Sequence, residues 1–65
     1  MPMIRVEMLA GRNEDQKREL AKELTDAFVR TCGGTPDGLH IVITDIEKHN
    51  WAVGGQLLSD KLPDK

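Results

Sequence analysis

Pro2 is the residue best suited to chemistry, because it directly follows the initiator Met1. If Met1 is removed, the ring nitrogen of Pro2 becomes a free secondary amine. An α-amino group titrates near ~8, well below the ~10.4 of a lysine side chain. Burial or a neighbouring cation disfavours its charged form further, so such an amine can act as a general base at neutral pH. Proline also commonly stands second in a chain for structural reasons, so the rest of the sequence must decide.

The sequence offers few residues for disulfide formation, zinc binding or nucleophilic catalysis. Cys32 is the only cysteine, which excludes a disulfide within the chain. One cysteine and two histidines also make a structural zinc site unfavourable. No Ser-His-Asp or Cys-His pairing stands at a useful spacing, and Cys32 is predicted to be a small buried hydrophobic residue rather than a nucleophile.

Composition excludes several partner classes. The formal net charge is −2, from 9 basic and 11 acidic residues, and the aromatic residues are Phe28 and Trp51. Nucleic-acid binding, which needs a positive face and often aromatic stacking, is therefore not expected. No segment resembles a signal peptide or approaches the ~20 apolar residues of a membrane span. With one unpaired cysteine, the expected location is the cytoplasm.

The length of 65 residues allows one domain, spanning 1–65. A chain this short buries only ~60% of the surface that it exposes when unfolded. Small domains compensate with disulfides, a metal or oligomerisation. Because the first two are disfavoured here, we expect an obligate homo-oligomer with a shared core.

The elements that position Pro2 follow from the patterning. Residues 2–9 form a strand in which Ile4, Val6 and Met8 share one face. A capping box of Asn13 and Gln16 starts an amphipathic helix over 14–32, which ends before Gly33-Gly34. A second strand covers 39–45, with an apolar centre typical of a strand covered on both faces.

The remaining segments complete an α+β fold. The helix is long enough to return the chain to the start of the sheet, which predicts a parallel βαβ unit. Gly54-Gly55 indicates a short hairpin arm over 51–58, followed by a polar tail over 60–65. Because a two-stranded sheet is not stable alone, its completion by other copies is expected.

Taken together, these features resemble the 4-oxalocrotonate tautomerase (2-hydroxymuconate tautomerase) family over roughly Pro2 to Ser59. The shared signature consists of Pro2, Leu9-x-Gly11-Arg12 before an acidic helix start containing Gln16-Lys17, Val42-Ile43-Thr44, and an aromatic residue before Gly54-Gly55. No single motif is specific, but their order in so short a chain is.

The resemblance implies an isomerase without cofactor or metal, which interconverts enol and keto forms of 2-oxo acids such as 2-hydroxymuconate. The resemblance also implies a role in the degradation of aromatic compounds. It implies that Pro2 is the catalytic base after removal of Met1, and that Arg12 grips a substrate carboxylate or polarises the 2-oxo group. It further implies dimers assembled into a hexamer, a trimer of dimers, with this arginine reaching the substrate across a subunit boundary.

Two positions depart from the family pattern. His40 stands where well-studied members carry a second arginine, and it offers a hydrogen bond without a fixed charge. His40 either contacts the substrate or is an interface histidine whose hydrogen bonds are satisfied within the protein. Trp51 replaces a phenylalanine; it is a pocket wall or an ordinary interface aromatic.

Two other readings stay open. A hydratase or dehalogenase acting on an unsaturated acid would keep the fold and Pro2, but it would need a dedicated carboxylate that the sequence does not reveal. A non-catalytic oligomer that binds carboxylates at Arg12, or an interaction module, would need no proline chemistry.

Overall fold

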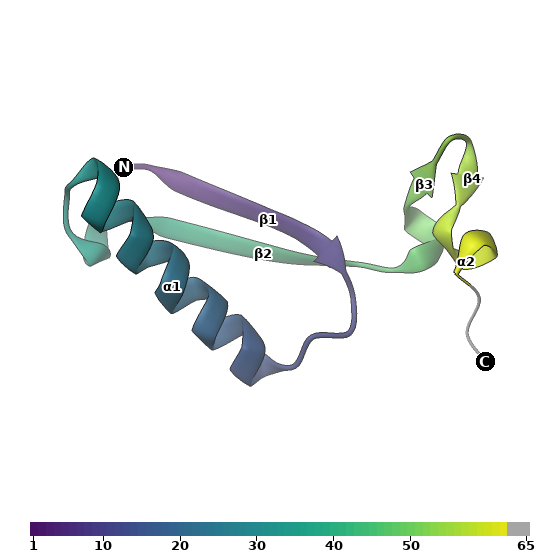
Figure 1. The fold of residues 1–65 in the computed structure, drawn as a ribbon, viewed down its shortest axis with the longest axis horizontal. Helices are drawn as coiled ribbons and strands as arrows, with labels where there is room; N and C mark the ends of the chain where they lie inside the picture. Colours follow the sequence, from purple (N-terminus) through teal and green to yellow (C-terminus); the bar gives the residue numbers. More distant parts are fainter. Residues whose placement is uncertain (63–65) are drawn as a thin grey trace.

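The computed structural model describes residues 1–62. Strand β1 (Met3–Leu9) leads into helix α1 (Glu14–Cys32), and strand β2 (His40–Ile46) follows. The two strands pair in parallel along their whole length. Figure 1 shows α1 running obliquely past this two-stranded sheet. The predicted parallel βαβ architecture is confirmed.

Local sequence sets both ends of α1. The side-chain oxygen of Asn13 accepts a hydrogen bond from the Gln16 N–H at 2.8 Å, and the Gln16 side chain accepts one from the Asn13 N–H at 2.9 Å. At the other end, Gly33 adopts φ 83°, a conformation that favours glycine, and its N–H donates to the Val29 carbonyl at 3.0 Å. The predicted capping box is therefore formed.

Within residues 1–62, no helix has the length and apolar character needed to cross a bilayer.

Burial alternates along both strands. In β1 the half-buried residues are Ile4, Val6, Met8 and Leu9, and in β2 they are Ile41, Ile43 and Ile46. The prediction that β2 is covered on both faces is wrong for the single chain, where Val42 is 41% exposed. The reason is that α1 covers only one face of the sheet. Leu39 is buried, and it precedes β2, which starts at His40, one residue later than predicted.

The C-terminal arm, residues 51–62, stands beyond the carboxyl ends of the sheet strands (Figure 1). Its strands β3 (Ala52–Val53) and β4 (Gln56–Leu57) are antiparallel. They join through Gly54-Gly55, whose φ angles of 62° and 82° suit a tight hairpin turn. The predicted short hairpin is confirmed.

Two expectations for the end of the chain and for Cys32 need correction. Asp60 and Lys61, which were predicted to belong to the polar tail, form part of a one-turn helix, α2 (Leu58–Lys61). The Leu62 N–H donates a hydrogen bond to the Leu58 carbonyl at 2.7 Å and closes this turn. A single helical turn accommodates polar residues because their side chains can point outward. The rest of that prediction, 63–65, lies outside the described residues. Cys32 is exposed rather than buried, since it ends α1 at the turn into Gly33.

The single chain has almost no core of its own. Among residues 1–62, Leu39 alone is buried. The radius of gyration is 15.1 Å, whereas about 11 Å is typical of a globular chain of this length. The exposed area of 5082 Å² exceeds by about 900 Å² the value expected for this mass. That excess resembles one partner's share of a standard interface, about 800 Å².

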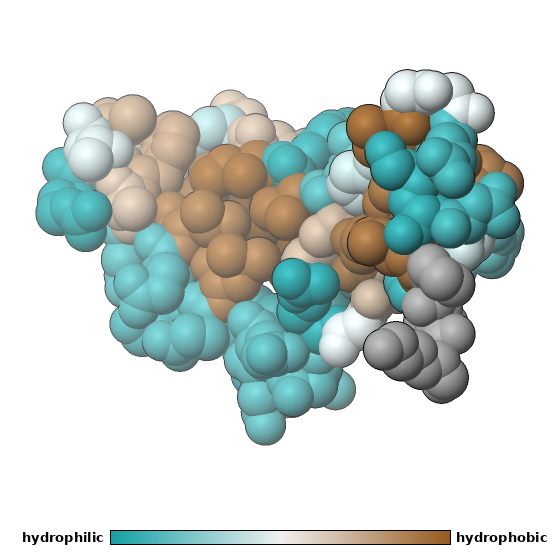
Figure 2. Space-filling model, turned by 45° about the vertical axis from the view of Figure 1, so that its right-hand side comes forward, coloured by the Kyte–Doolittle hydropathy of each residue, from teal (hydrophilic) through white to brown (hydrophobic). Residues whose placement is uncertain are grey.

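Apolar surface is exposed on both the sheet and the arm. Figure 2 shows hydrophobic residues across the middle of one face and again around the arm. The large apolar side chains exposed by 40% or more are Met1, Met3, Val42, Val53, Leu57 and Leu62. An apolar surface spread over so small a chain is typical of a subunit, and a sheet of only two strands is consistent with oligomerisation.

Candidate active site

Pro2 and His40 lie together at the amino end of the sheet. The His40 N–H donates a hydrogen bond to the Pro2 carbonyl at 3.1 Å, and His40 pairs with Met3 in the strand register. Pro2 and His40 are both exposed. With Met1 attached, the Pro2 nitrogen is an amide; its removal leaves the amine at an open strand end beside the His40 backbone.

Arg12 lies past the opposite end of β1. It occupies the four-residue loop 10–13, the Arg12 loop, between β1 and α1. Its side chain is exposed, and Nη1 reaches the Leu9 carbonyl at 3.5 Å, the outer limit of a hydrogen bond. The guanidinium therefore keeps most of its donors available for an anion.

Trp51 follows β2 and starts the C-terminal arm. It is half-buried, and its carbonyl accepts a hydrogen bond from the Leu58 N–H at 2.8 Å, which closes the base of the hairpin. Figure 1 places the arm at the end of the sheet away from the N-terminus. Trp51 therefore lies near the carboxyl ends of the sheet strands, whereas Pro2 lies at their amino ends.

The single chain therefore divides the four predicted site residues into two groups. Pro2 and His40 stand where the strands begin, and Arg12 and Trp51 come after the strands have ended. Seven strand residues separate these ends by about 23 Å. A site that contains all four residues cannot form within one chain and requires residues from at least two copies.

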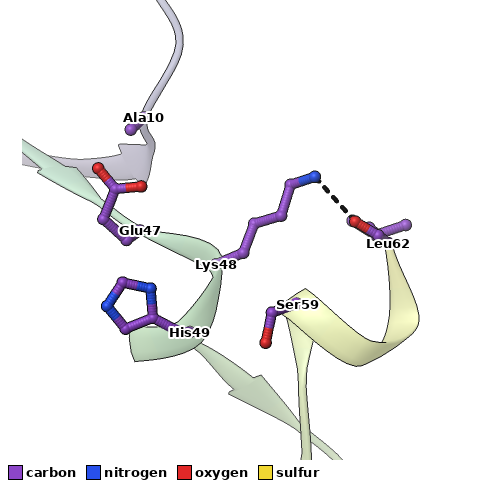
Figure 3. A pocket seen from close by; sticks show the side chains of 6 residues that line it. All are labelled: Ala10, Glu47, Lys48, His49, Ser59 and Leu62. Atoms are coloured by element: carbon purple, nitrogen blue, oxygen red, sulfur yellow. Dashed lines mark hydrogen bonds between the residues drawn. The ribbon is translucent and has the colours of Figure 1, made fainter. Parts of the chain in front are cut away.

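A separate cavity of about 290 Å³ lies between the short 3-10 turn at Lys48–Asn50 and α2. Figure 3 shows its lining residues, Ala10, Glu47, Lys48, His49, Ser59 and Leu62. The Lys48 Nζ donates to the Leu62 carbonyl at 2.8 Å and ties the arm to this turn. None of the four predicted site residues lines this cavity, so it is not the place where a proline base would work.

Titratable groups add little to the site itself. Within the described part of the chain, no group of three or more His, Cys, Asp or Glu residues could hold a metal ion. The hydrogen bond and charge of Asp26 raise the pKa of the Lys22 ammonium above its ordinary value, on the exposed side of α1. Lys22 is the ninth residue of α1, so the pair lies more than two helical turns beyond the Arg12 loop.

One contact near Arg12 was missed by the sequence reasoning. The Asp45 carboxylate, near the carboxyl end of β2, pairs with the Lys17 ammonium at 2.5 Å. The signal was present, because Lys17 stands three and seven residues before Leu20 and Leu24 and so lies on the sheet-facing stripe of α1. A charge on that stripe needs a partner on the sheet.

Comparisons with known proteins cover almost the whole chain. A family model described as "Tautomerase enzyme" matches residues 2–61. A probable tautomerase from Bacillus cereus is 43% identical over 61 residues, covering 94% of this chain and 100% of that protein. A 2-hydroxymuconate tautomerase from Bacillus subtilis is 38% identical over 60 residues, covering 92% and 97%.

Solved structures agree with these relatives. A homologue of 4-oxalocrotonate tautomerase superposes with a TM-score of 0.87 at 37% identity, covering 91% of this chain and 97% of that one. A heterohexameric 4-oxalocrotonate tautomerase from Chloroflexus aurantiacus superposes with a TM-score of 0.85 at 30% identity, covering 92% and 97%.

Proposed function

This chain belongs to the tautomerase enzyme family, and on that premise we propose that it is an enol–keto tautomerase whose general base is Pro2 after removal of Met1. The substrate class is 2-hydroxymuconate-like dienols or another enolisable 2-oxo acid. The observation that carries the proposal is the position of Pro2, at the open amino end of β1 beside the start of β2. Pro2 is exposed there, so an amine formed by removal of Met1 would be accessible to a substrate.

The reaction needs only one proton carrier. The Pro2 nitrogen takes the proton of the enol hydroxyl, the oxygen lone pair forms the carbonyl, and the double bonds shift along the chain. The protonated amine then returns the proton to the terminal carbon of the shifted system, so no cofactor is consumed. One amine can take and give this proton when its pKa lies near the working pH.

The other residues would bind the substrate and stabilise charge. Arg12 would hold a carboxylate through its planar fork, and its exposed guanidinium is free to do so. Trp51 would supply the apolar wall that disfavours the ammonium form of Pro2. His40, adjacent to Pro2 through the backbone, would donate a hydrogen bond to the second polar group of the substrate.

Because Pro2 and Arg12 stand at opposite ends of the sheet, this site requires a homo-oligomer. We propose a hexamer built as a trimer of dimers, in which Arg12 of one copy approaches Pro2 of another. The solved heterohexameric 4-oxalocrotonate tautomerase, which is similar to this chain, supports the proposal of six subunits.

The test is ketonisation of 2-hydroxymuconate, followed by ultraviolet absorbance on protein whose mass confirms loss of Met1. Pro2→Ala should lower kcat by about a hundredfold, near the lower limit of general-base contributions, since it retains a primary amine. Arg12→Ala should lower kcat/KM by about ten- to a hundredfold, and Arg30→Ala, on the helix surface, serves as the matched arginine control. A Pro2→Ala enzyme as fast as the unsubstituted one would refute the proline mechanism.

A further inference from the structure

The Arg12 loop is short and must be held by its ends. Its first residue, Ala10, donates its N–H to the Ile46 carbonyl at 3.0 Å, which fixes the loop to the end of β2. Its last residue, Asn13, is fixed by the capping box with Gln16. Within residues 1–62, the one hydrogen bond of the Arg12 side chain is the 3.5 Å interaction with the Leu9 carbonyl. The direction of the guanidinium therefore depends on where these backbone anchors hold the loop.

Lys17 and Asp45 form an ion pair that connects the start of α1 to the same place on β2. The Nζ–Oδ2 distance is 2.5 Å, and the side chains are 29% and 40% exposed. Three further ion pairs lie within α1 itself, between Arg18 and its two acidic neighbours and between Lys22 and Asp26, and their side chains are 52–89% exposed. The Lys17–Asp45 pair is thus less exposed than these three, and it joins α1 to β2 through residues that lie 28 positions apart in the sequence.

Helix electrostatics do not explain a lysine at position 17. It is the fourth residue of α1, where the helix dipole favours negative rather than positive charge. The Asp45 carboxylate compensates that unfavourable placement. Because Asp45 directly precedes Ile46, the carboxylate that holds α1 and the carbonyl that holds Ala10 come from consecutive residues of β2.

We propose that the Lys17–Asp45 ion pair positions Arg12 to bind the carboxylate of the substrate, an inference that rests on the proposed function of Arg12. The pair and the Ala10–Ile46 hydrogen bond fasten the helix side and the strand side of the loop to one point of the sheet. When both ends of the Arg12 loop are held in this way, the backbone of Arg12 is fixed, and the guanidinium extends from that fixed position. Lys17 and Asp45 are positioning residues: they act through Arg12 and do not touch the substrate.

The test measures binding apart from turnover. The probe is muconate, a dicarboxylate that lacks the 2-hydroxyl group and cannot ketonise, and its Kd is measured by titration calorimetry. Lys17→Met should raise this Kd, and the KM of ketonisation, by about tenfold, as a displaced binding group does. The value of kcat should change by less than about twofold. Asp45→Asn should act in the same direction, and Lys17→Arg should restore most of the affinity.

Lys22→Met is the matched control. It removes an ion pair of the same helix at Asp26, 3.0 Å long and exposed, and should leave both Kd and KM unchanged. The decisive comparison combines Lys17→Met with Arg12→Ala. Because Lys17 acts through Arg12, the double variant should bind muconate no more weakly than Arg12→Ala alone.

Three results would overturn the inference: equal Kd values for Lys17→Met and the unsubstituted protein, additive effects in the double variant, or an Arg12→Ala Kd that does not rise. Failure of the proposed function has a different signature, which is muconate binding that depends on Arg12 without any turnover of 2-hydroxymuconate. Asp45→Asn, which keeps the size of the side chain, provides the second route if Lys17→Met does not assemble.

Discussion

Mixing the two impaired variants, Pro2→Ala and Arg12→Ala, should raise activity above that of either parent if each site draws Pro2 and Arg12 from different copies. The basis is the separation of about 23 Å imposed by the seven residues of β1. Pro2→Ala copies retain Arg12, and Arg12→Ala copies retain Pro2. In an oligomer that contains both, a site is intact wherever an Arg12→Ala copy supplies Pro2 and a Pro2→Ala copy supplies Arg12.

The expected recovery follows from random mixing. With equal amounts of the two variants, each contributor has the required form half of the time, so about one quarter of the sites are intact in a symmetric oligomer. The variants are co-expressed with distinguishable tags, the mixed assemblies are isolated, and ketonisation is compared with each parent. If both residues came from one copy, no mixed site would be intact and activity would stay at the level of the parents.

A dilution experiment supplies the control. When the unsubstituted chain is mixed equally with a chain carrying both substitutions, sites shared between copies fall to about one quarter, whereas sites within one copy fall only to about one half. Recovery near zero in the first mixture and one half in the second would refute the reasoning from strand length.

Three further perturbations test the fold and the site. Asn13→Ala removes the capping box and should cost about 1 kcal/mol, which lowers the melting temperature by about 4–8 °C for a domain of this size; an unchanged melting curve would show that the cap is redundant. Val42→Asp places a charge on the uncovered sheet face and should dissociate the oligomer in sedimentation analysis, because an unpaired charge buried in an interface costs roughly 3–5 kcal/mol; an intact oligomer would show that this face stays in water. Trp51→Ala should raise KM by roughly tenfold while Trp51→Phe keeps most activity, since an apolar wall needs area rather than an indole N–H; equal KM values for both would remove Trp51 from the site.

Much of the fold was predictable because its signals are local. Asn13 and Gln16 start α1 through bonds across three residues, and Gly54-Gly55 turns the arm through its own backbone angles. The adjacency of Pro2 and His40 follows once β1 and β2 are parallel. These predicted elements therefore already place Pro2 and His40 at one end of the sheet and Arg12 and Trp51 beyond the other.

What could not be predicted depends on contacts between distant parts of the chain. The position of Lys17 on the apolar stripe of α1 indicates a partner on the sheet, but the choice of Asp45 depends on where α1 crosses the sheet, which no local pattern specifies. The exposure of Val42 likewise depends on how much of the sheet one helix covers. The helical turn at Leu58–Lys61 was missed because a single turn carries no periodicity.

Among residues 1–62 only Leu39 is buried within the single chain. The stability of the folded state should therefore depend on protein concentration. When most apolar contacts form between copies, the folded state is favoured by mass action, and its melting temperature rises with concentration. Below a threshold concentration the subunits separate, lose their packing and become accessible to proteases. Doubling the amount of chain near that threshold should then more than double the number of assembled molecules, so synthesis rate would act as a steep switch on activity.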